Sequence, residues 1–108
     1  MDAQEFDAFV RENWSRRKSA AAYAFEKPQP TRDLYIMATG LAGETGEVME
    51  LLKKHVRDGR IDRQELLLEL GDVLHYLTRI AAEYGLTLIE VMDANRKKLE
   101  QRARERGW

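Results

Sequence analysis

Two acidic couplets carry the residue types in this sequence that are best suited to chemistry. They are Glu44-Thr45-Gly46-Glu47 and Glu69-Leu70-Gly71-Asp72, and each is set inside an apolar helical pattern. Carboxylates three residues apart project from neighbouring positions on one face of a helix. Four carboxylates brought together by two packed helices repel one another, so a divalent cation is their natural occupant. The expected metal ligands are Glu44, Glu47, Glu69 and Asp72.

The faces on which the couplets lie matter more than their spacing. At about 100° per residue, Glu44 falls inside the apolar stripe of its helix and Glu47 lies on the shoulder of that stripe. Glu69 lies at the edge of the stripe on the next helix, with Asp72 beside it. A carboxylate turned towards the core must be paired, protonated or bound to a metal, because an unpaired buried charge is strongly unfavourable.

Helical elements must position these carboxylates. Apolar residues recur at helical spacing over residues of about 3–14, 31–57, 62–84 and 88–104, and no segment reads convincingly as a strand. Capping boxes open the last two of these helices, and two prolines break the pattern before the second. A short helix is also expected around residues 20–25. The sequence therefore predicts an all-α, four-helix-bundle-like fold, with residues 1–108 forming a single domain.

Composition and charge argue against several classes of function. The formal net charge of -1 offers no basic surplus for binding nucleic acid. The absence of cysteine excludes disulfides and thiolate metal sites. No apolar run approaches the length of a membrane span, and the acidic start of the chain does not resemble a signal peptide. We therefore expect a cytoplasmic protein that binds neither nucleic acid nor membrane.

The residues around the couplets resemble a known family. Residues 40–51, residues 69–74 and residues 95–102 are similar to the all-α nucleoside triphosphate pyrophosphohydrolases of the MazG type. That family carries Glu-x-x-Glu on one helix, Glu-x-x-Asp on the next, and an Asn-x-x-Lys-Leu-x-x-Arg pattern on the last. The resemblance covers about residues 31–104, and the set of motifs in this order is fairly specific.

The resemblance implies Mg²⁺-dependent hydrolysis of a nucleoside or deoxynucleoside triphosphate to the monophosphate and pyrophosphate, as nucleotide-pool housekeeping. The four couplet carboxylates would hold Mg²⁺, with Mn²⁺ as a possible substitute, and the metal would activate the attacking water. One position departs from the family pattern, because Gly43 stands where relatives often carry a further Glu. A metal-bound hydroxide oriented by one of the ligands is then the simpler route to activated water.

Further residues are expected to bind the nucleotide. Asn95 interrupts the apolar stripe of the last helix and needs polar partners, which a phosphate or ribose would supply. Lys98 and Arg102 are four residues apart and form a cationic edge for a polyphosphate. The resemblance adds Trp14 as a contact for the base and Lys53 at a position that is often basic in relatives. For Trp14, a role as core anchor of the first helix is an equally open interpretation.

Alternative interpretations of the acidic residues stay open. They are surface acids spaced by chance, or acids neutralised by a basic side chain such as Arg79. A carboxylate-bridged di-iron centre would use Asp72 and His75, but the second Glu-x-x-His pair that it needs is missing. A catalytically weak or inactive helical module that binds nucleotide or a protein partner is favoured by Gly43.

Apolar residues outside the main stripes predict an assembly. Four of them lie off the stripes of the second and third helices: Tyr35, Ile36, Leu67 and Leu74. Apolar faces that one chain does not cover are typically buried against a second copy. We therefore expect a homodimer or a higher homo-oligomer.

Overall fold

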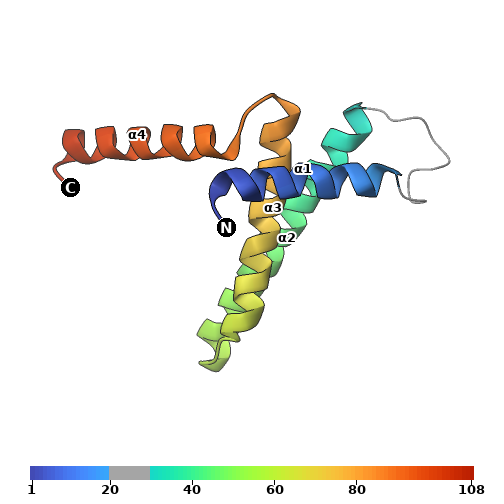
Figure 1. The fold of residues 1–108 in the computed structure, drawn as a ribbon. Helices are drawn as coiled ribbons and strands as arrows, with labels where there is room; N and C mark the ends of the chain where they lie inside the picture. Colours follow the sequence, from blue (N-terminus) through green and yellow to red (C-terminus); the bar gives the residue numbers. More distant parts are fainter. Residues whose placement is uncertain (20–29) are drawn as a thin grey trace.

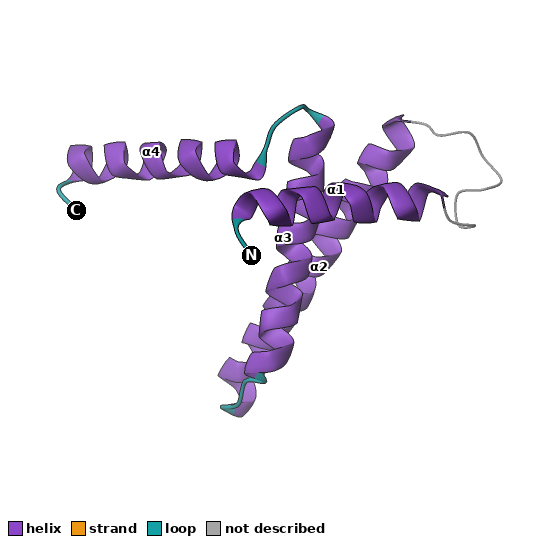
Figure 2. Cartoon of the chain, in the orientation of Figure 1, coloured by secondary structure: helices purple, strands orange, loops and turns teal. Residues whose placement is uncertain are grey.

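The computed structural model describes residues 1–19 and 30–108, and these residues form four helices (Figure 1). The helices are α1 (Ala3–Ser19), α2 (Pro30–Asp58), α3 (Arg63–Glu83) and α4 (Leu88–Arg106). The described residues contain no strand, so the expected all-α class is confirmed (Figure 2). The first helix continues past Trp14 to Ser19, because the basic residues that follow Trp14 have good helix propensity. The short helix expected around residues 20–25 lies outside the described residues.

Local hydrogen bonds fix the ends of α3 and α4. The Asp62 carboxylate accepts a hydrogen bond from the Glu65 backbone N–H at 3.0 Å and so caps α3. Thr87 and Glu90 form the complete capping box at the start of α4, with hydrogen bonds of 3.1 and 2.9 Å. Gly85 has a φ of 72°, which lets the chain leave α3 and turn towards α4.

The helices α2 and α3 pack side by side as an antiparallel hairpin, and α1 crosses it (Figure 1). From the end of α3, α4 runs away from the hairpin, and within the described residues it contacts α1 and α3 but not α2. The radius of gyration is 16.9 Å, whereas a compact domain of this length has a radius of roughly 13 Å. The extended α4 therefore leaves much of its own surface uncovered. No described helix is both long enough and apolar enough to cross a membrane.

The core lies between α2 and α3 and where α1 crosses the hairpin. Its buried apolar residues are Val10, Trp14, Met37, Leu51, Ala81 and Leu88. The Trp14 ring is only 2% exposed, and the guanidinium carbon of Arg79 lies 5.3 Å from its centroid. This cation–π contact is reinforced because Arg79 also pairs with Glu83 at 2.9 Å. Trp14 thus anchors α1 on α3.

A buried carboxylate joins α1 to the start of α4. Asp7 is 6% exposed and accepts hydrogen bonds from the Leu88 backbone N–H at 2.8 Å and from Arg11 Nε at 2.7 Å. Burial raises the pKa of Asp7, but the two hydrogen bonds and the Arg11 charge outweigh burial and hold this pKa below its usual value. The Arg11 guanidinium also donates to the Leu86 carbonyl oxygen at 3.2 Å. Asp7 was not singled out by the sequence analysis.

Candidate metal centre

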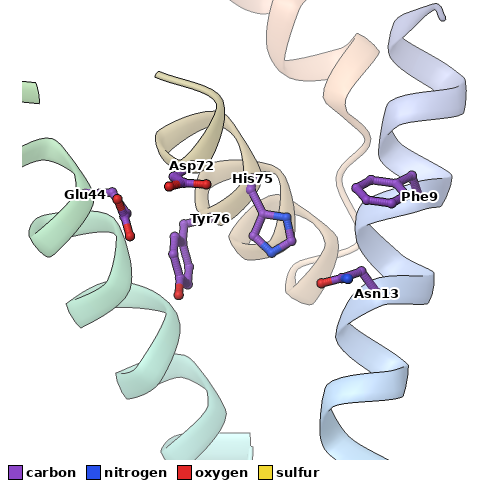
Figure 3. Close-up of a pocket in the computed structure, with 6 residues that line it drawn as sticks. All are labelled: Phe9, Asn13, Glu44, Asp72, His75 and Tyr76. Atoms are coloured by element: carbon purple, nitrogen blue, oxygen red, sulfur yellow. The ribbon is translucent and has the colours of Figure 1, made fainter. Parts of the chain in front are cut away.

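The hairpin brings the two acidic couplets together. Glu44, Glu69 and Asp72 each place one carboxylate oxygen so that all three oxygens lie within 4.8 Å of one another. Glu44 and Glu69 are partly buried, and Asp72 is exposed. Figure 3 shows the Glu44 side chain of α2 and the Asp72 side chain of α3 close to each other. We call these three residues the acidic cluster.

The crowding of negative charge changes the pKa of Glu44. The pKa of Glu44 is raised to about 7 by a hydrogen bond with Glu69, by burial, and by the charges of Asp72, Glu69 and Glu47. A carboxyl group with such a pKa is protonated in about half of the molecules at pH 7, because its neighbours cannot all stay ionised. A divalent cation bound to the cluster would relieve the same repulsion.

Glu69 provides a second sign that the cluster suits a metal ion. Its Oε2 atom is buried and has no hydrogen-bond partner within the described residues. Leaving a buried acceptor without a partner costs about 1–3 kcal/mol. Coordination of a hard cation such as Mg²⁺ by this oxygen would remove that cost, so the donor set and its environment fit a divalent metal.

Glu47, the fourth ligand expected from the sequence, is exposed and lies outside the acidic cluster. The Glu47 charge nevertheless helps to raise the pKa of Glu44, so Glu47 lies close enough for the two carboxylates to repel each other. The structure therefore brings together three of the four expected ligands. Participation of Glu47 stays a prediction.

A cleft of about 390 Å³ opens beside the cluster, between α1, α2 and α3 (Figure 3). Its lining residues are Phe9, Asn13, Glu44, Asp72, His75 and Tyr76. One side of the cleft is acidic, and the side formed by α1 is neutral and aromatic. The sequence analysis missed Phe9, Asn13 and Tyr76. Phe9 and Asn13 are four residues apart and so share one face of α1, which is the signal that could have linked them.

The residues expected to bind the nucleotide lie elsewhere within the described part of one chain. Trp14 lies in the core, and Lys53 is exposed and pairs with Glu50 at 3.0 Å. Asn95, Lys98 and Arg102 are exposed on α4, which does not contact α2. None of these five lines the cleft. For the three residues on α4 the reason is the direction of that helix, since periodicity identifies the faces of a helix but not where its axis points.

Neutralisation by a basic side chain and a di-iron centre gain no support from the geometry. Arg79 pairs with Glu83 and Lys53 pairs with Glu50, so within the described residues neither cation neutralises the cluster. His75 projects from α3 towards α1, on the side of the cleft away from Glu44 (Figure 3). The metal-ligand group found within the described residues contains three carboxylates and no histidine. This donor set is that of a hard cation rather than of a di-iron centre.

Comparison with known proteins gives the family. The MazG nucleotide pyrophosphohydrolase domain matches residues 33–107, which include both couplets and all of α4. The chain is 38% identical over 79 residues to the Gene 37 protein of Mycobacterium phage L5, and the aligned part covers 68% of each chain. No solved structure matches. The chain therefore belongs to the MazG nucleotide pyrophosphohydrolase family, which confirms the resemblance and the expected fold.

Proposed function

We propose that this protein hydrolyses a nucleoside or deoxynucleoside triphosphate to the monophosphate and pyrophosphate in a Mg²⁺-dependent reaction, as nucleotide-pool housekeeping. The observation that carries the proposal is the convergence of three carboxylate oxygens within 4.8 Å beside a cleft, in a chain of the MazG family. Mg²⁺ favours hard oxygen ligands and shares its coordination sphere with water and substrate phosphates. Mn²⁺ is a reasonable substitute because carboxylate and water also suit it.

The acidic cluster would hold the metal, with Glu47 as a fourth ligand. When bound, Mg²⁺ supplies neutralisation of phosphate charge and a lowered pKa for a bound water. Glu44, with a pKa of about 7 in the metal-free protein, would give up its proton if a metal ion filled the cluster. Residue 43 is glycine and offers no carboxylate base, so the orientation of the attacking water falls to one of the cluster carboxylates.

The neutral side of the cleft suits the nucleoside. Phe9 presents an aromatic ring there, and Asn13 and His75 present hydrogen-bonding groups. With the phosphates beside the acidic cluster, the base and sugar would lie towards α1. This arrangement is supported by the lining of the cleft.

A homodimer or a higher homo-oligomer is also part of the proposal. Leu67 on α3 is 62% exposed and Tyr35 on α2 is 69% exposed, as the sequence analysis expected of residues outside the main stripes. Asn95, Lys98 and Arg102 lie on α4, which runs away from the hairpin that carries the acidic cluster. In an oligomer, α4 of a second copy would bring these three side chains to the phosphates. Such an arrangement reconciles the phosphate-binding role of α4 with its direction.

The direct test is a panel of nucleoside and deoxynucleoside triphosphates incubated with the purified protein and Mg²⁺ or Mn²⁺, with released pyrophosphate as the readout. We expect pyrophosphate and the monophosphate from at least one substrate, and none when EDTA removes the metal. Inorganic phosphate as the sole product would contradict the proposed bond cleavage. Binding of nucleotides without any turnover would instead favour a helical binding module, the alternative to which Gly43 points.

A further inference from the structure

Gly40 of α2 lies against the ring of Tyr76 of α3. A Cβ atom added to Gly40 would overlap the ring, 2.5 Å from Cζ and 2.9 Å from Cδ1 of Tyr76. All seven glycines of the chain lie in the described residues, and a Cβ on any of the other six would meet nothing within 4 Å. Gly40 is therefore the one glycine whose missing side chain makes room for a neighbour.

The contact between Gly40 and Tyr76 lies next to the acidic cluster along the hairpin. Gly40 precedes Glu44 by four residues on α2, and Tyr76 follows Asp72 by four residues on α3. Because the helices are antiparallel, the contact and the cluster lie at successive levels of the hairpin, about one helical turn apart. Figure 3 shows the Tyr76 ring between the two helices, next to Glu44 and Asp72. The closeness of α2 and α3 at residue 40 thus bears directly on the spacing of the carboxylates.

We propose that Gly40 is a positioning residue for the metal centre, an inference that rests on the function proposed above. Its missing side chain lets the Tyr76 ring close against α2, and this close approach holds Glu44 within reach of Glu69 and Asp72. A methyl group at residue 40 forces the ring or the helix to shift by about 1 Å to restore ordinary contact. Sites of this kind need their ligands held within about 0.5 Å of the productive geometry.

The test is a double-mutant cycle read out by binding of Mn²⁺, followed by electron paramagnetic resonance of the free ion. Gly40→Ala is compared with wild type, and Gly40→Ala/Tyr76→Ala is compared with Tyr76→Ala. Gly46→Ala is the matched control, because Gly46 lies on the same helix and its added Cβ meets nothing. Both glycine replacements raise helix propensity equally, so the difference between them reports the clash with the ring.

We expect Gly40→Ala to weaken Mn²⁺ binding by about 10- to 100-fold, the range found when groups that orient metal ligands are altered. Gly46→Ala should bind as wild type does. In the Tyr76→Ala background the same Gly40→Ala change should cause no further loss, because the ring that it displaces is absent.

Two results overturn the positioning role of Gly40. The first is unchanged Mn²⁺ binding by Gly40→Ala, which would mean that the ring moves aside without disturbing the ligands. The second is an equal loss in both backgrounds, which would mean that Tyr76 is not the cause. If circular dichroism shows that Gly40→Ala does not fold, Mn²⁺ binding by Tyr76→Ala alone is measured instead, because this change removes the same ring contact with α2. Undiminished binding there overturns the role.

The cycle also separates this inference from the proposed function. A wild-type protein that does not bind Mn²⁺ at all contradicts the metal centre and with it the role of Gly40. A wild-type protein that binds Mn²⁺ and loses binding on Glu44→Gln, but not on Gly40→Ala, keeps the metal centre and contradicts the positioning role alone.

Discussion

The Asp7 carboxylate accepts a hydrogen bond from the backbone N–H of Leu88 at 2.8 Å, across 81 residues of the chain. The family match begins at residue 33, so Asp7 lies in the part of the chain that the match does not cover. This part contains α1, which supplies Phe9 and Asn13 to the cleft beside the acidic cluster. Asp7 therefore connects α1, which forms the neutral side of the cleft, to the first turn of α4.

Replacing Asp7 should destabilise the fold. Asp7→Ala leaves the Leu88 N–H buried without its acceptor and removes the partner of Arg11, so we expect a loss of about 1–3 kcal/mol in the free energy of unfolding. Urea denaturation followed by circular dichroism measures this change. Glu12→Ala is the control, because Glu12 pairs with Arg16 on the exposed face of the same helix, where an ion pair contributes only about 0.2–1 kcal/mol. Equal losses from the two variants would contradict the structural role of Asp7.

The contribution of Asp7 should also depend on pH. Its pKa in the folded protein lies below the usual value, so its stabilisation is present above the unfolded pKa and is lost as the pH falls through the folded pKa. The difference in stability between wild type and Asp7→Asn should therefore be largest near neutral pH and shrink in acid. A difference that grows as the pH falls would contradict this assignment.

The contribution of Glu44 to stability should change with pH in the opposite direction to that of Asp7. Its pKa in the metal-free protein is raised from 4.5 to about 7, so its stabilising contribution is complete below the unfolded pKa and is lost as the pH rises through 7. In EDTA, the melting temperature of wild type should fall between pH 5 and pH 8 relative to that of Glu44→Gln. Saturating Mg²⁺ should raise the wild-type melting temperature most at pH 8, where the cluster is ionised.

Removing a ligand should abolish metal-dependent chemistry while the fold persists. Glu44→Gln should lower Mg²⁺-dependent kcat/KM by more than about 100-fold, since it removes a ligand rather than a group that merely orients one. Glu50→Gln is the matched control, because Glu50 lies on the same helix and pairs with Lys53 away from the cleft. Full activity in a correctly folded Glu44→Gln protein would show that the metal site has been misassigned.

The neutral side of the cleft, which α1 forms, should affect substrate binding rather than metal binding. Asn13→Ala removes a hydrogen-bonding side chain that lines the cleft outside the acidic cluster. We expect KM to rise by about 3- to 10-fold, as for the loss of one hydrogen bond, with the Mn²⁺ dissociation constant unchanged. Steady-state kinetics and Mn²⁺ titration together measure the two effects. A weakened Mn²⁺ affinity would place Asn13 at the metal rather than at the nucleoside.

The helices and the acidic cluster could be anticipated from the sequence because both depend on local patterns. Helical periodicity placed Glu44 on an inward face, and the short turn between α2 and α3 brought the second couplet opposite it. The direction of α4 could not be anticipated, because it depends on the turn at Gly85 and on the contact of Leu88 with Asp7. Apolar patterning also does not distinguish the core from the wall of a cleft.

Trp14 and Phe9 show this last limit. Both recur at helical spacing on α1, yet Trp14 is 2% exposed in the core and Phe9 is 53% exposed at the cleft. The resemblance offered Trp14 as a base contact with a core role equally open, and the structure places Trp14 in the core and Phe9 at the cleft. Which of the two positions is accessible is decided by the crossing of α1 over α3, a long-range feature that the sequence of α1 does not contain.

The assembly can be tested by mixing two inactive variants. Glu44→Gln removes a metal ligand, and Lys98→Ala/Arg102→Ala removes the cationic edge of α4. If α4 of a second copy completes each cleft, a mixed dimer has one site with neither defect and one site with both. After subunit exchange in an equal mixture, about half of the dimers are mixed, so about one quarter of the wild-type activity should return. If each α4 serves its own chain, every site carries one of the two defects and no activity returns.

Size-exclusion chromatography with light scattering should show a dimer or larger assembly for wild type, and a monomer at micromolar concentration would contradict the proposed oligomer.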